Sequence, residues 1–163
     1  TPDAIDAIRL VCEEVPEAVV GAGTILTSKD FSYAVAAGAR FIVSPGITQE
    51  LLDAASMSDV PFLPGAATPS EVMAAREEGY SLLKFFPAEQ SGGAPFLKAL
   101  SSPLASIRFC PTGGVSPKNV GDYLSLPNVI CVGGSWVAPD KAIEAGDWAS
   151  IEALAREASG LKR

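Results

Sequence analysis

Lys84 is the residue of this sequence whose surroundings most clearly suggest chemistry. It lies in an apolar run over residues 81–87 that a proline ends, and the run is typical of a buried strand. Burying an unpaired ammonium is costly, so such a lysine tends to lose its proton. A neutral lysine is a nucleophile that can form a Schiff base with a carbonyl substrate. The alternative is a lysine that extends from a strand end to water.

Burial can lower the pKa of a lysine enough to cause the proton loss that this chemistry requires. The reference pKa of lysine is ~10.4, and a shift to ~7 corresponds to about 4.6 kcal/mol of disfavoured charge. The other five lysines stand in polar helix or loop contexts, where we expect solvent-exposed side chains: Lys29, Lys98, Lys118, Lys141 and Lys162. Lys84 is therefore the candidate nucleophile.

Composition narrows the class of protein. The 163 residues are 48% hydrophobic and 19% charged, which is typical of a globular chain rather than a disordered one. The net charge is −7 with no basic stripe, so we expect no nucleic-acid partner. No apolar run approaches the roughly 18–20 residues of a transmembrane helix, so we expect no membrane partner. The chain has no histidine, which excludes Ser-His-Asp and Cys-His catalysis and zinc sites with histidine ligands.

The cysteines indicate a cellular compartment. Cys12, Cys110 and Cys131 are an odd number and lie in apolar contexts. We interpret them as reduced core thiols of a cytoplasmic protein, with a redox role as the alternative.

The elements that must position Lys84 alternate regularly. Apolar strands are expected near residues 18–23, 41–44, 61–65, 82–86, 107–110 and 129–132, with helical segments before, between and after them. Six strands and seven helical segments predict βα units on a parallel sheet. The favoured fold is a (β/α)8 TIM barrel, and an open doubly wound sheet is the alternative. Functional residues of both folds lie at the carboxyl ends of the strands.

Glycine-rich loops follow the last two predicted strands. Gly113-Gly114 and Gly133-Gly134-Ser135 could bring backbone amides close to an anion, as in barrel phosphate sites, or could be simple turns. Gly21-x-Gly23 lacks the third glycine of a dinucleotide fingerprint, and no Walker motif is present. Glu89 is interpreted as an acidic residue that favours the start of the next helix, with a general base as the alternative.

Five motifs together resemble one family, the class I 2-keto-3-deoxy-6-phosphogluconate (KDPG) aldolases, which are also described with 4-hydroxy-2-oxoglutarate (KHG) aldolase activity. In chain order the motifs span residues 20–24 (Val-Gly-Ala-Gly-Thr), 44–46 (Ser-Pro-Gly), 84–89 (Lys-Phe-Phe-Pro-Ala-Glu), 109–114 (Phe-Cys-Pro-Thr-Gly-Gly) and 132–136 (Val-Gly-Gly-Ser-Trp). The resemblance covers nearly the whole chain.

The resemblance implies a fold, a reaction and a set of site residues. It implies a (β/α)8 barrel, usually a homotrimer, that cleaves the phosphorylated keto acid reversibly to pyruvate and glyceraldehyde 3-phosphate without a metal or cofactor. Lys84 would be the Schiff-base lysine, and Thr24 and Pro45 would line the pyruvate pocket. Phe86 would pack beside the imine. The sugar-phosphate end would be held by Thr112, Gly113, Gly114, Gly134 and Ser135. By the same resemblance, Thr112 favours the gluco acid as the substrate.

The chain departs from the family at its N-terminus. The family's base glutamate and carboxylate-binding arginine belong upstream of Thr1, and Thr1-Pro2-Asp3 is typical of a helix start. We therefore expect a fragment: one incomplete barrel domain over residues 1–163 that supplies about six strands, numbers 3–8, and is at best weakly active alone. Two further hypotheses are a non-catalytic phosphate-ligand module and a phosphosugar isomerase or epimerase in which Lys84 acts only by its charge.

Overall fold

The computed structural model describes residues 3–162. The chain divides into two compact units, residues 1–86 and 87–163. The expectation of one domain over residues 1–163 therefore stays a prediction.

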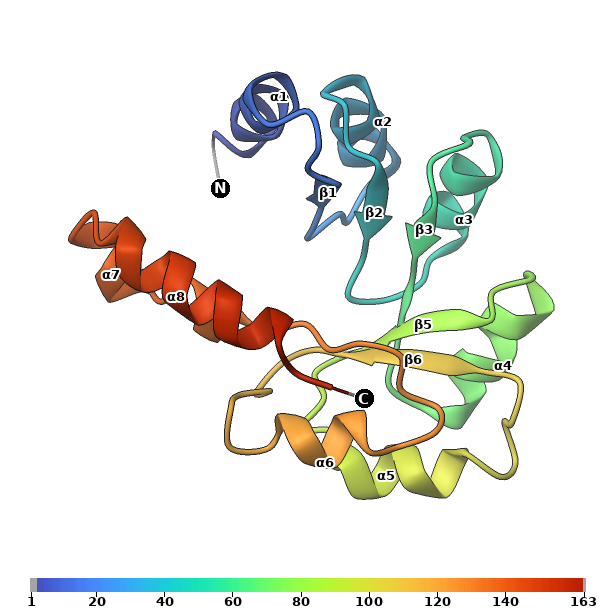
Figure 1. The fold of residues 1–163 in the computed structure, drawn as a ribbon. Helices are drawn as coiled ribbons and strands as arrows, with labels where there is room; N and C mark the ends of the chain where they lie inside the picture. The colour runs from blue at the N-terminus through green and yellow to red at the C-terminus, as the bar shows by residue number, and fades with distance from the viewer. Residues whose placement is uncertain (1–2, 163) are drawn as a thin grey trace. The chain divides into compact units, whose positions relative to one another are not determined.

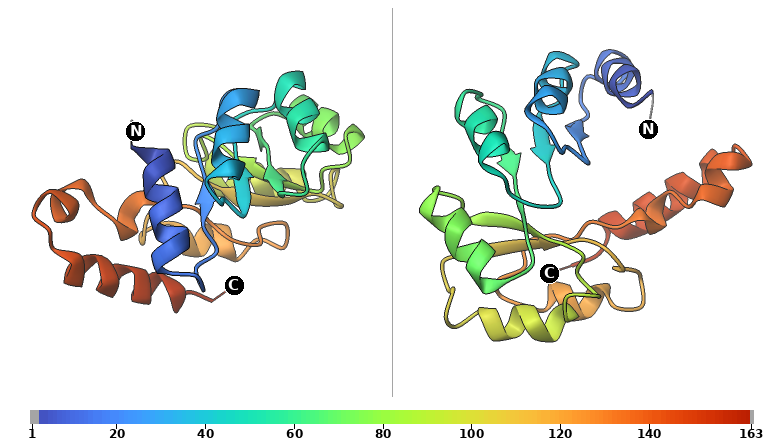
Figure 2. Two further views of the ribbon diagram at one scale, coloured as in Figure 1. Left: turned by 90° about the horizontal axis from the view of Figure 1, so that it is seen from above. Right: turned by 180° about the vertical axis from the view of Figure 1, so that it is seen from behind.

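The first unit begins with three helix–strand pairs. They are α1 (Ala4–Glu14), β1 (Gly21–Ala22), α2 (Ser28–Ala36), β2 (Phe41–Val43), α3 (Gln49–Ser56) and β3 (Phe62–Leu63) (Figure 1). The strands are parallel in the order β1-β2-β3, with Gly21 opposite Phe41 and Ile42 opposite Phe62. Figure 2 shows α1, α2 and α3 in a row beside these strands. Phe31, Ile42 and Leu51 are buried between the helices and the strands.

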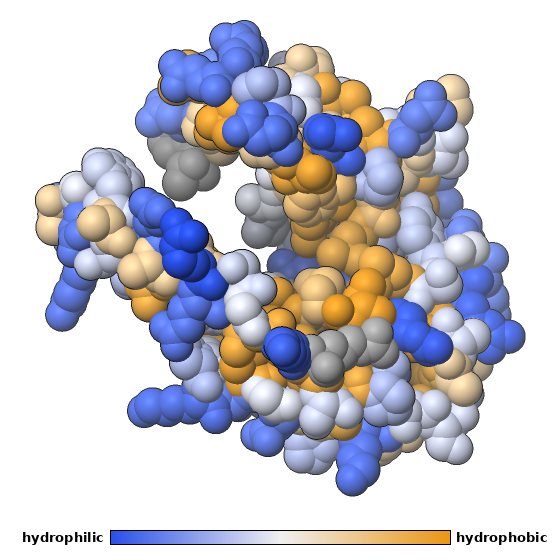
Figure 3. All heavy atoms as spheres, viewed as in Figure 1, coloured by the Kyte–Doolittle hydropathy of each residue, from blue (hydrophilic) through white to orange (hydrophobic). Residues whose placement is uncertain are grey.

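Apolar residues are not confined to this core. Figure 3 shows apolar side chains gathered over the strands of the first unit, while hydrophilic ones cover the visible side of α1. Val19 and Met57 are exposed by 64% and 88%. These side chains leave apolar surface available for a contact.

Local sequence explains where the helices of the first unit begin. The Thr27, Thr48 and Thr68 side chains each accept a hydrogen bond from a backbone N–H in the first turn of the following helix. Thr68 and Glu71 form a full capping box ahead of α4 (Pro69–Glu77), which follows β4 (Gly65–Ala66). The unit ends with β5 (Leu82–Phe85), which pairs in parallel with β4.

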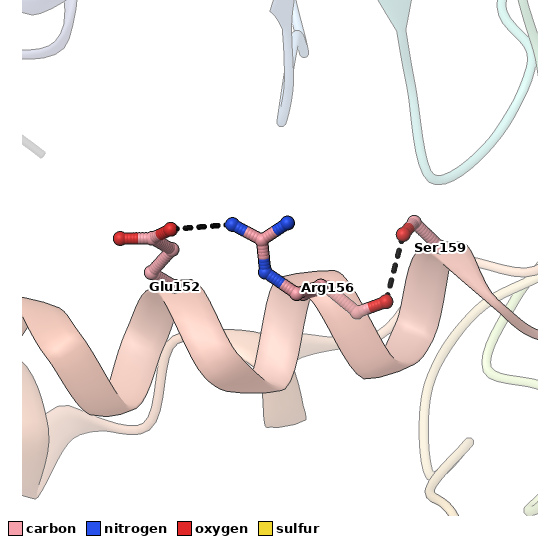
Figure 4. Close-up of polar contacts among 3 residues, drawn as sticks. All are labelled: Glu152, Arg156 and Ser159. Atoms are coloured by element: carbon pink, nitrogen blue, oxygen red, sulfur yellow. Dashed lines mark hydrogen bonds and ion pairs between the residues drawn. The ribbon is translucent and has the colours of Figure 1, made fainter.

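The second unit holds α5 (Gly93–Leu100), β6 (Arg108–Pro111), α6 (Val120–Leu124), a 3₁₀ turn η1 (Ser135–Val137), α7 (Asp140–Glu144) and α8 (Trp148–Ser159). Its core contains Leu97, Phe109 and Tyr123. The buried Asn128 side chain donates to the Leu97 carbonyl in the last turn of α5 at 2.8 Å, and this hydrogen bond ties the end of α5 to the core. On α8, Arg156 donates to Glu152 at 2.6 Å (Figure 4).

The predicted fold class is wrong. The strands of the described residues form two small three-stranded parallel sheets, and not strands 3–8 of one (β/α)8 barrel. The break falls inside the strand predicted over residues 61–65. Pro64 has no N–H and so cannot extend the ladder with β2. From Pro64 onward the chain pairs with β5 instead, and the Lys84 amide donates to the Pro64 carbonyl at 2.9 Å. One predicted strand thus becomes β3 and β4.

Two further expectations need correction. Residues 129–132 form no strand, and only isolated parallel bridges join Phe109 to Val129 and Thr112 to Gly133. Ser116-Pro117 is typical of a helix start in the sequence, but the helix α6 begins only at Val120. Of the predicted N-terminal helix start, Thr1 and Pro2 lie outside the described residues, and α1 begins after Asp3 without a side-chain cap.

No helix among residues 3–162 is both long enough and apolar enough to cross a membrane.

Candidate functional site

Lys84 lies on β5, as predicted, but on the half-buried face of the strand. Successive side chains of a strand point to opposite faces, so Leu83 and Phe85 are fully buried while Lys84 is half-buried. Phe86 is two residues further along on the same side as Lys84. The Lys84 Nζ lies 4.7 Å from the centroid of the Phe86 ring. The lysine is thus held beside an aromatic face at the strand's carboxyl end.

Pro45 is connected to Lys84 through Gly65. Gly65 is the register partner of Lys84 in the β4–β5 pair. A Cβ placed on Gly65 would lie only 2.1 Å from the Pro45 carbonyl oxygen. The Gly65 amide also donates to the Gly46 carbonyl at 3.3 Å. Only glycine permits this backbone approach, which brings the loop after β2 to the end of β5.

Thr24 has a different environment. It follows β1 and is exposed. It lines a pocket of about 240 Å³ together with Ile5 and Ile8 of α1 and Tyr33 of α2. The structure therefore brings Pro45, Lys84 and Phe86 together in the first unit and places Thr24 beside α1 and α2.

The glycine loop after β6 forms the second group of predicted residues. Gly113 and Gly114 have φ of 95° and 78°, a backbone conformation that favours glycine. The Ala88 amide donates to the Thr112 carbonyl at 2.8 Å, and the Glu89 amide donates to the Gly113 carbonyl at 3.1 Å. The loop is therefore fixed from residues 88 and 89.

Thr112 has an unsatisfied hydroxyl. Its Oγ1 is buried and has no hydrogen-bond partner among the described residues. A buried polar atom without a partner is costly, so the position suits a group that a ligand would supply. A Cβ on Gly133 would lie 2.2 Å from the Thr112 methyl group, so Gly133 must be glycine for Thr112 to sit there.

Gly134 and Ser135 follow on the next segment. A Cβ on Gly134 would lie 1.7 Å from the Trp136 ring, so this glycine makes room for the indole. Ser135 is exposed and opens the 3₁₀ turn η1. In the second unit, Thr112, Gly113 and Gly114 thus lie next to the segment of Gly133.

The helix-start interpretation of Glu89 is wrong. Helix α5 begins at Gly93 with Gly92 as its N-cap, and no acidic residue lies in its first turn. The Glu89 carboxylate instead accepts a hydrogen bond from the Tyr123 hydroxyl on α6. Sequence reasoning missed Tyr123, because the partners are 34 residues apart and no local pattern joins them.

The cysteine prediction is confirmed in one respect and wrong in another. All three cysteines are thiols, and Cys12 donates to the Gly38 carbonyl at 3.4 Å. None of the three is a core residue, however, because Cys12 and Cys110 are half-buried and Cys131 is exposed. A hydrogen bond with Cys110 stabilises the thiolate and lowers the pKa of Cys131 to about 7, against the opposing effect of burial.

The five remaining lysines are exposed, as predicted. Within residues 3–162, no group of three or more Cys, Asp or Glu side chains is arranged to hold a metal ion.

A half-buried lysine at the end of a parallel strand, with an aromatic ring beside it, defines an α/β protein suited to Schiff-base chemistry. The chain also matches the aldolase family described as KDPG and KHG aldolase over residues 1–154, and it belongs to that family. It is 53% identical to the 2-dehydro-3-deoxy-phosphogluconate aldolase of Pseudomonas aeruginosa, covering 97% of this chain and 72% of the relative. It is 51% identical to the KHG/KDPG aldolase of Escherichia coli K12, covering 97% and 74%.

Solved structures agree. The KDPG aldolase of Legionella pneumophila, captured with pyruvate as a covalent carbinolamine, superimposes with a TM-score of 0.94 at 48% identity, covering 97% of this chain and 77% of that one. The aldolase of Zymomonas mobilis with 3-phosphoglycerate gives 0.92 at 48% identity, covering 100% and 76%. These matches bear out the family resemblance seen in the sequence motifs.

Proposed function

We propose that this chain is a Schiff-base aldolase, a lyase that reversibly cleaves KDPG to pyruvate and glyceraldehyde 3-phosphate. The observation that carries the proposal is Lys84, half-buried at the carboxyl end of β5 beside the Phe86 ring, in a chain of the KDPG and KHG aldolase family. The relative captured as a covalent carbinolamine with pyruvate shows that such a protein bonds to this keto acid.

The chemistry follows from an amine at this position. The neutral Lys84 Nζ adds to the C2 ketone, and loss of water gives an iminium. The electrons of the C3–C4 bond move into the iminium as the C4 hydroxyl proton leaves to a base, which releases glyceraldehyde 3-phosphate and leaves an enamine. Protonation at C3 and hydrolysis then give pyruvate and restore the amine.

Each remaining site residue has a proposed role in binding. Thr24 and Pro45 contact the pyruvate part, and Phe86 packs against the imine. Thr112 uses its unpaired hydroxyl for a substrate oxygen. The phosphate is held by backbone amides of the glycine loops, supported by the positive φ of Gly113 and Gly114. The proposed loop residues are Gly113, Gly114, Gly134 and Ser135.

Borohydride reduction in the presence of pyruvate tests the proposal. The imine is reduced to a stable secondary amine, so the peptide that contains Lys84 should gain the mass of the trapped keto acid. Lys84→Met should abolish both trapping and cleavage, whereas Lys98→Met, a change at an exposed lysine, should leave both intact. Absence of the mass gain on the Lys84 peptide would exclude a Schiff-base aldolase and favour a non-catalytic phosphate-binding protein.

We also propose a homotrimer in the cytoplasm. The exposed apolar side chains of the first unit, such as Val19 and Met57, offer surface for a subunit contact. The three thiols fit a reducing compartment. Sedimentation equilibrium should give three times the chain mass, and a monomer at micromolar concentration would contradict the trimer.

A further inference from the structure

Tyr123 is a fully buried residue that the proposed reaction does not use. It lies on α6 with no exposed surface, and its hydroxyl donates to Glu89 Oε1. Burial, together with the nearby Glu89 carboxylate, raises the pKa of Tyr123, so the phenol keeps its proton and remains a donor. The hydrogen bond therefore fixes which way the Glu89 carboxylate points.

Glu89 in turn packs directly against the glycine loop. A Cβ placed on Gly114 would lie 2.6 Å from Glu89 Cγ and 2.8 Å from Glu89 Cβ, so the stem of the glutamate fills the space beside the Gly114 backbone. The Glu89 amide donates to the Gly113 carbonyl at 3.1 Å. The side chain held by Tyr123 is thus one wall of the loop.

Asn119 holds the other end of the loop. Its Nδ2 donates to the Gly114 carbonyl at 3.0 Å, while its Oδ1 accepts from the Ser116 amide at 2.8 Å. Both carbonyls of the glycine pair are therefore engaged, Gly113 by Glu89 and Gly114 by Asn119. With the carbonyls held, the peptide planes of the loop are fixed in orientation.

We propose that Tyr123, through Glu89, and Asn119 are positioning residues that hold the Gly113-Gly114 loop in the conformation that receives the substrate phosphate. The inference rests on the proposed phosphate role of this loop. Prearranged amides bind an anion without the cost of ordering the loop on binding. Without the Tyr123 hydroxyl, the Glu89 carboxylate can turn toward the loop, where its negative charge opposes a phosphate.

The variant Tyr123→Phe tests the inference by removing a single oxygen atom. Removing the hydroxyl while keeping the ring should raise KM for KDPG about tenfold, the order expected for one hydrogen bond to a charged group. The kcat for KDPG and both constants for 4-hydroxy-2-oxoglutarate, which has no phosphate, should stay unchanged. Asn119→Ala should give the same split between the two substrates. Glu89→Gln, which keeps the shape and an acceptor, should lie closer to the parent than Glu89→Ala.

Tyr80→Phe is the matched control, because it removes the same atom from a tyrosine of the first unit that packs edge-on against Phe62. It should change neither substrate. Equal losses on both substrates in Tyr123→Phe and Asn119→Ala would show a merely structural role and overturn the inference, as would no change on either.

The inference and the proposed function fail in different ways. If the parent protein is not trapped with pyruvate and borohydride, the aldolase proposal fails. The affinity of the loop for inorganic phosphate is then measured by calorimetric titration. Weaker binding by Tyr123→Phe than by Tyr80→Phe supports the positioning role, and equal affinities overturn it.

Discussion

A single-residue alternation decides where Lys84 lies. The run around it is apolar on both sides, yet Leu83 and Phe85 take the buried face of β5 and leave Lys84 on the other. The consequence is a lysine that touches an aromatic ring and is still half-accessible. A nucleophile needs this compromise, because a substrate cannot reach a fully buried amine.

Cys131 is the second reactive group at the scale of single residues. Its pKa is lowered to about 7 by the hydrogen bond with Cys110, and its exposure lets a reagent reach it. We expect alkylation of Cys131 by iodoacetamide to rise with pH and to be half-maximal near pH 7, since only the thiolate reacts. Peptide mass spectrometry over a series of pH values measures this profile.

The variant Cys110→Ala removes the partner and should move the Cys131 profile toward the ordinary thiol pKa of ~8.5. Cys110→Ser, which keeps a donor, should stay near the parent. An unchanged profile in Cys110→Ala would show that Cys110 does not stabilise the thiolate. Cys12→Ala serves as the control for the number of thiols.

At the scale of elements, close backbone approaches arrange the strand ends. Gly65 lets β4 lie against the Pro45 carbonyl while it pairs with Lys84 on β5. We expect Gly65→Ala to lower the free energy of unfolding by about 1–3 kcal/mol or more, because the added methyl meets backbone that cannot rotate away. Urea denaturation measures the loss, and pyruvate trapping on Lys84 should weaken with it.

Gly46→Ala is the matched control for this change. Nothing lies within 4 Å of the Cβ that Gly46 would gain, although the residue belongs to the same contact. It should be nearly neutral or slightly stabilising. If both variants lose the same stability, the loss comes from the conformational freedom of glycine in general, and the Gly65 contact is not its cause.

At the scale of the whole molecule, local signals were sufficient for much of the secondary structure. The strand of Lys84 and the glycine loop at residues 113–114 follow from short stretches of sequence, and each of the Thr48 and Thr68 caps likewise depends on residues within one turn. The five motifs were sufficient to recognise the family. These features depend on neighbouring residues, and so the sequence exposes them directly.

Features that depend on distant partners could not be predicted in this way. The hydrogen bond between Glu89 and Tyr123 joins residues 34 positions apart. The split at Pro64 depends on which strand each neighbouring amide reaches, and the apolar run around Cys131 did not reveal that this residue is exposed. The assembly of the strands into sheets was therefore the least predictable level.

Three carboxylates give the molecule an acid-sensitive stability. Hydrogen bonds lower the pKa of Glu50, Glu71 and Asp147. The largest effect on Glu50 comes from the Ser28 hydroxyl, followed by the Ser28 amide, and the largest effect on Asp147 comes from the Ser150 hydroxyl, followed by the Ser150 amide. A carboxylate whose pKa is lower in the folded state contributes stability above its unfolded pKa, ~3.9 for Asp and ~4.3 for Glu. This contribution is lost as the pH falls through the folded pKa values.

Glu71 provides the sharpest test of this acid sensitivity. Its Oε2 accepts from the Ala67 amide at 2.8 Å and from the Thr68 amide and hydroxyl at 2.8 and 2.9 Å, with the Ala67 bond the largest cause of the lowered pKa. We expect Glu71→Gln to destabilise the protein at pH 7 and to destabilise it less at pH 3, which lies below the unfolded carboxyl pKa of ~4.3, so that the contribution of the lowered pKa is no longer fully present. Urea denaturation at both pH values measures the two differences.

Glu157→Gln is the control, because it makes the same change in net charge at an exposed site on α8, and it should be nearly neutral at both pH values. A Glu71→Gln defect that is equally large at pH 3 and pH 7 would mean that geometry alone, and not the charge on Glu71, stabilises the start of α4.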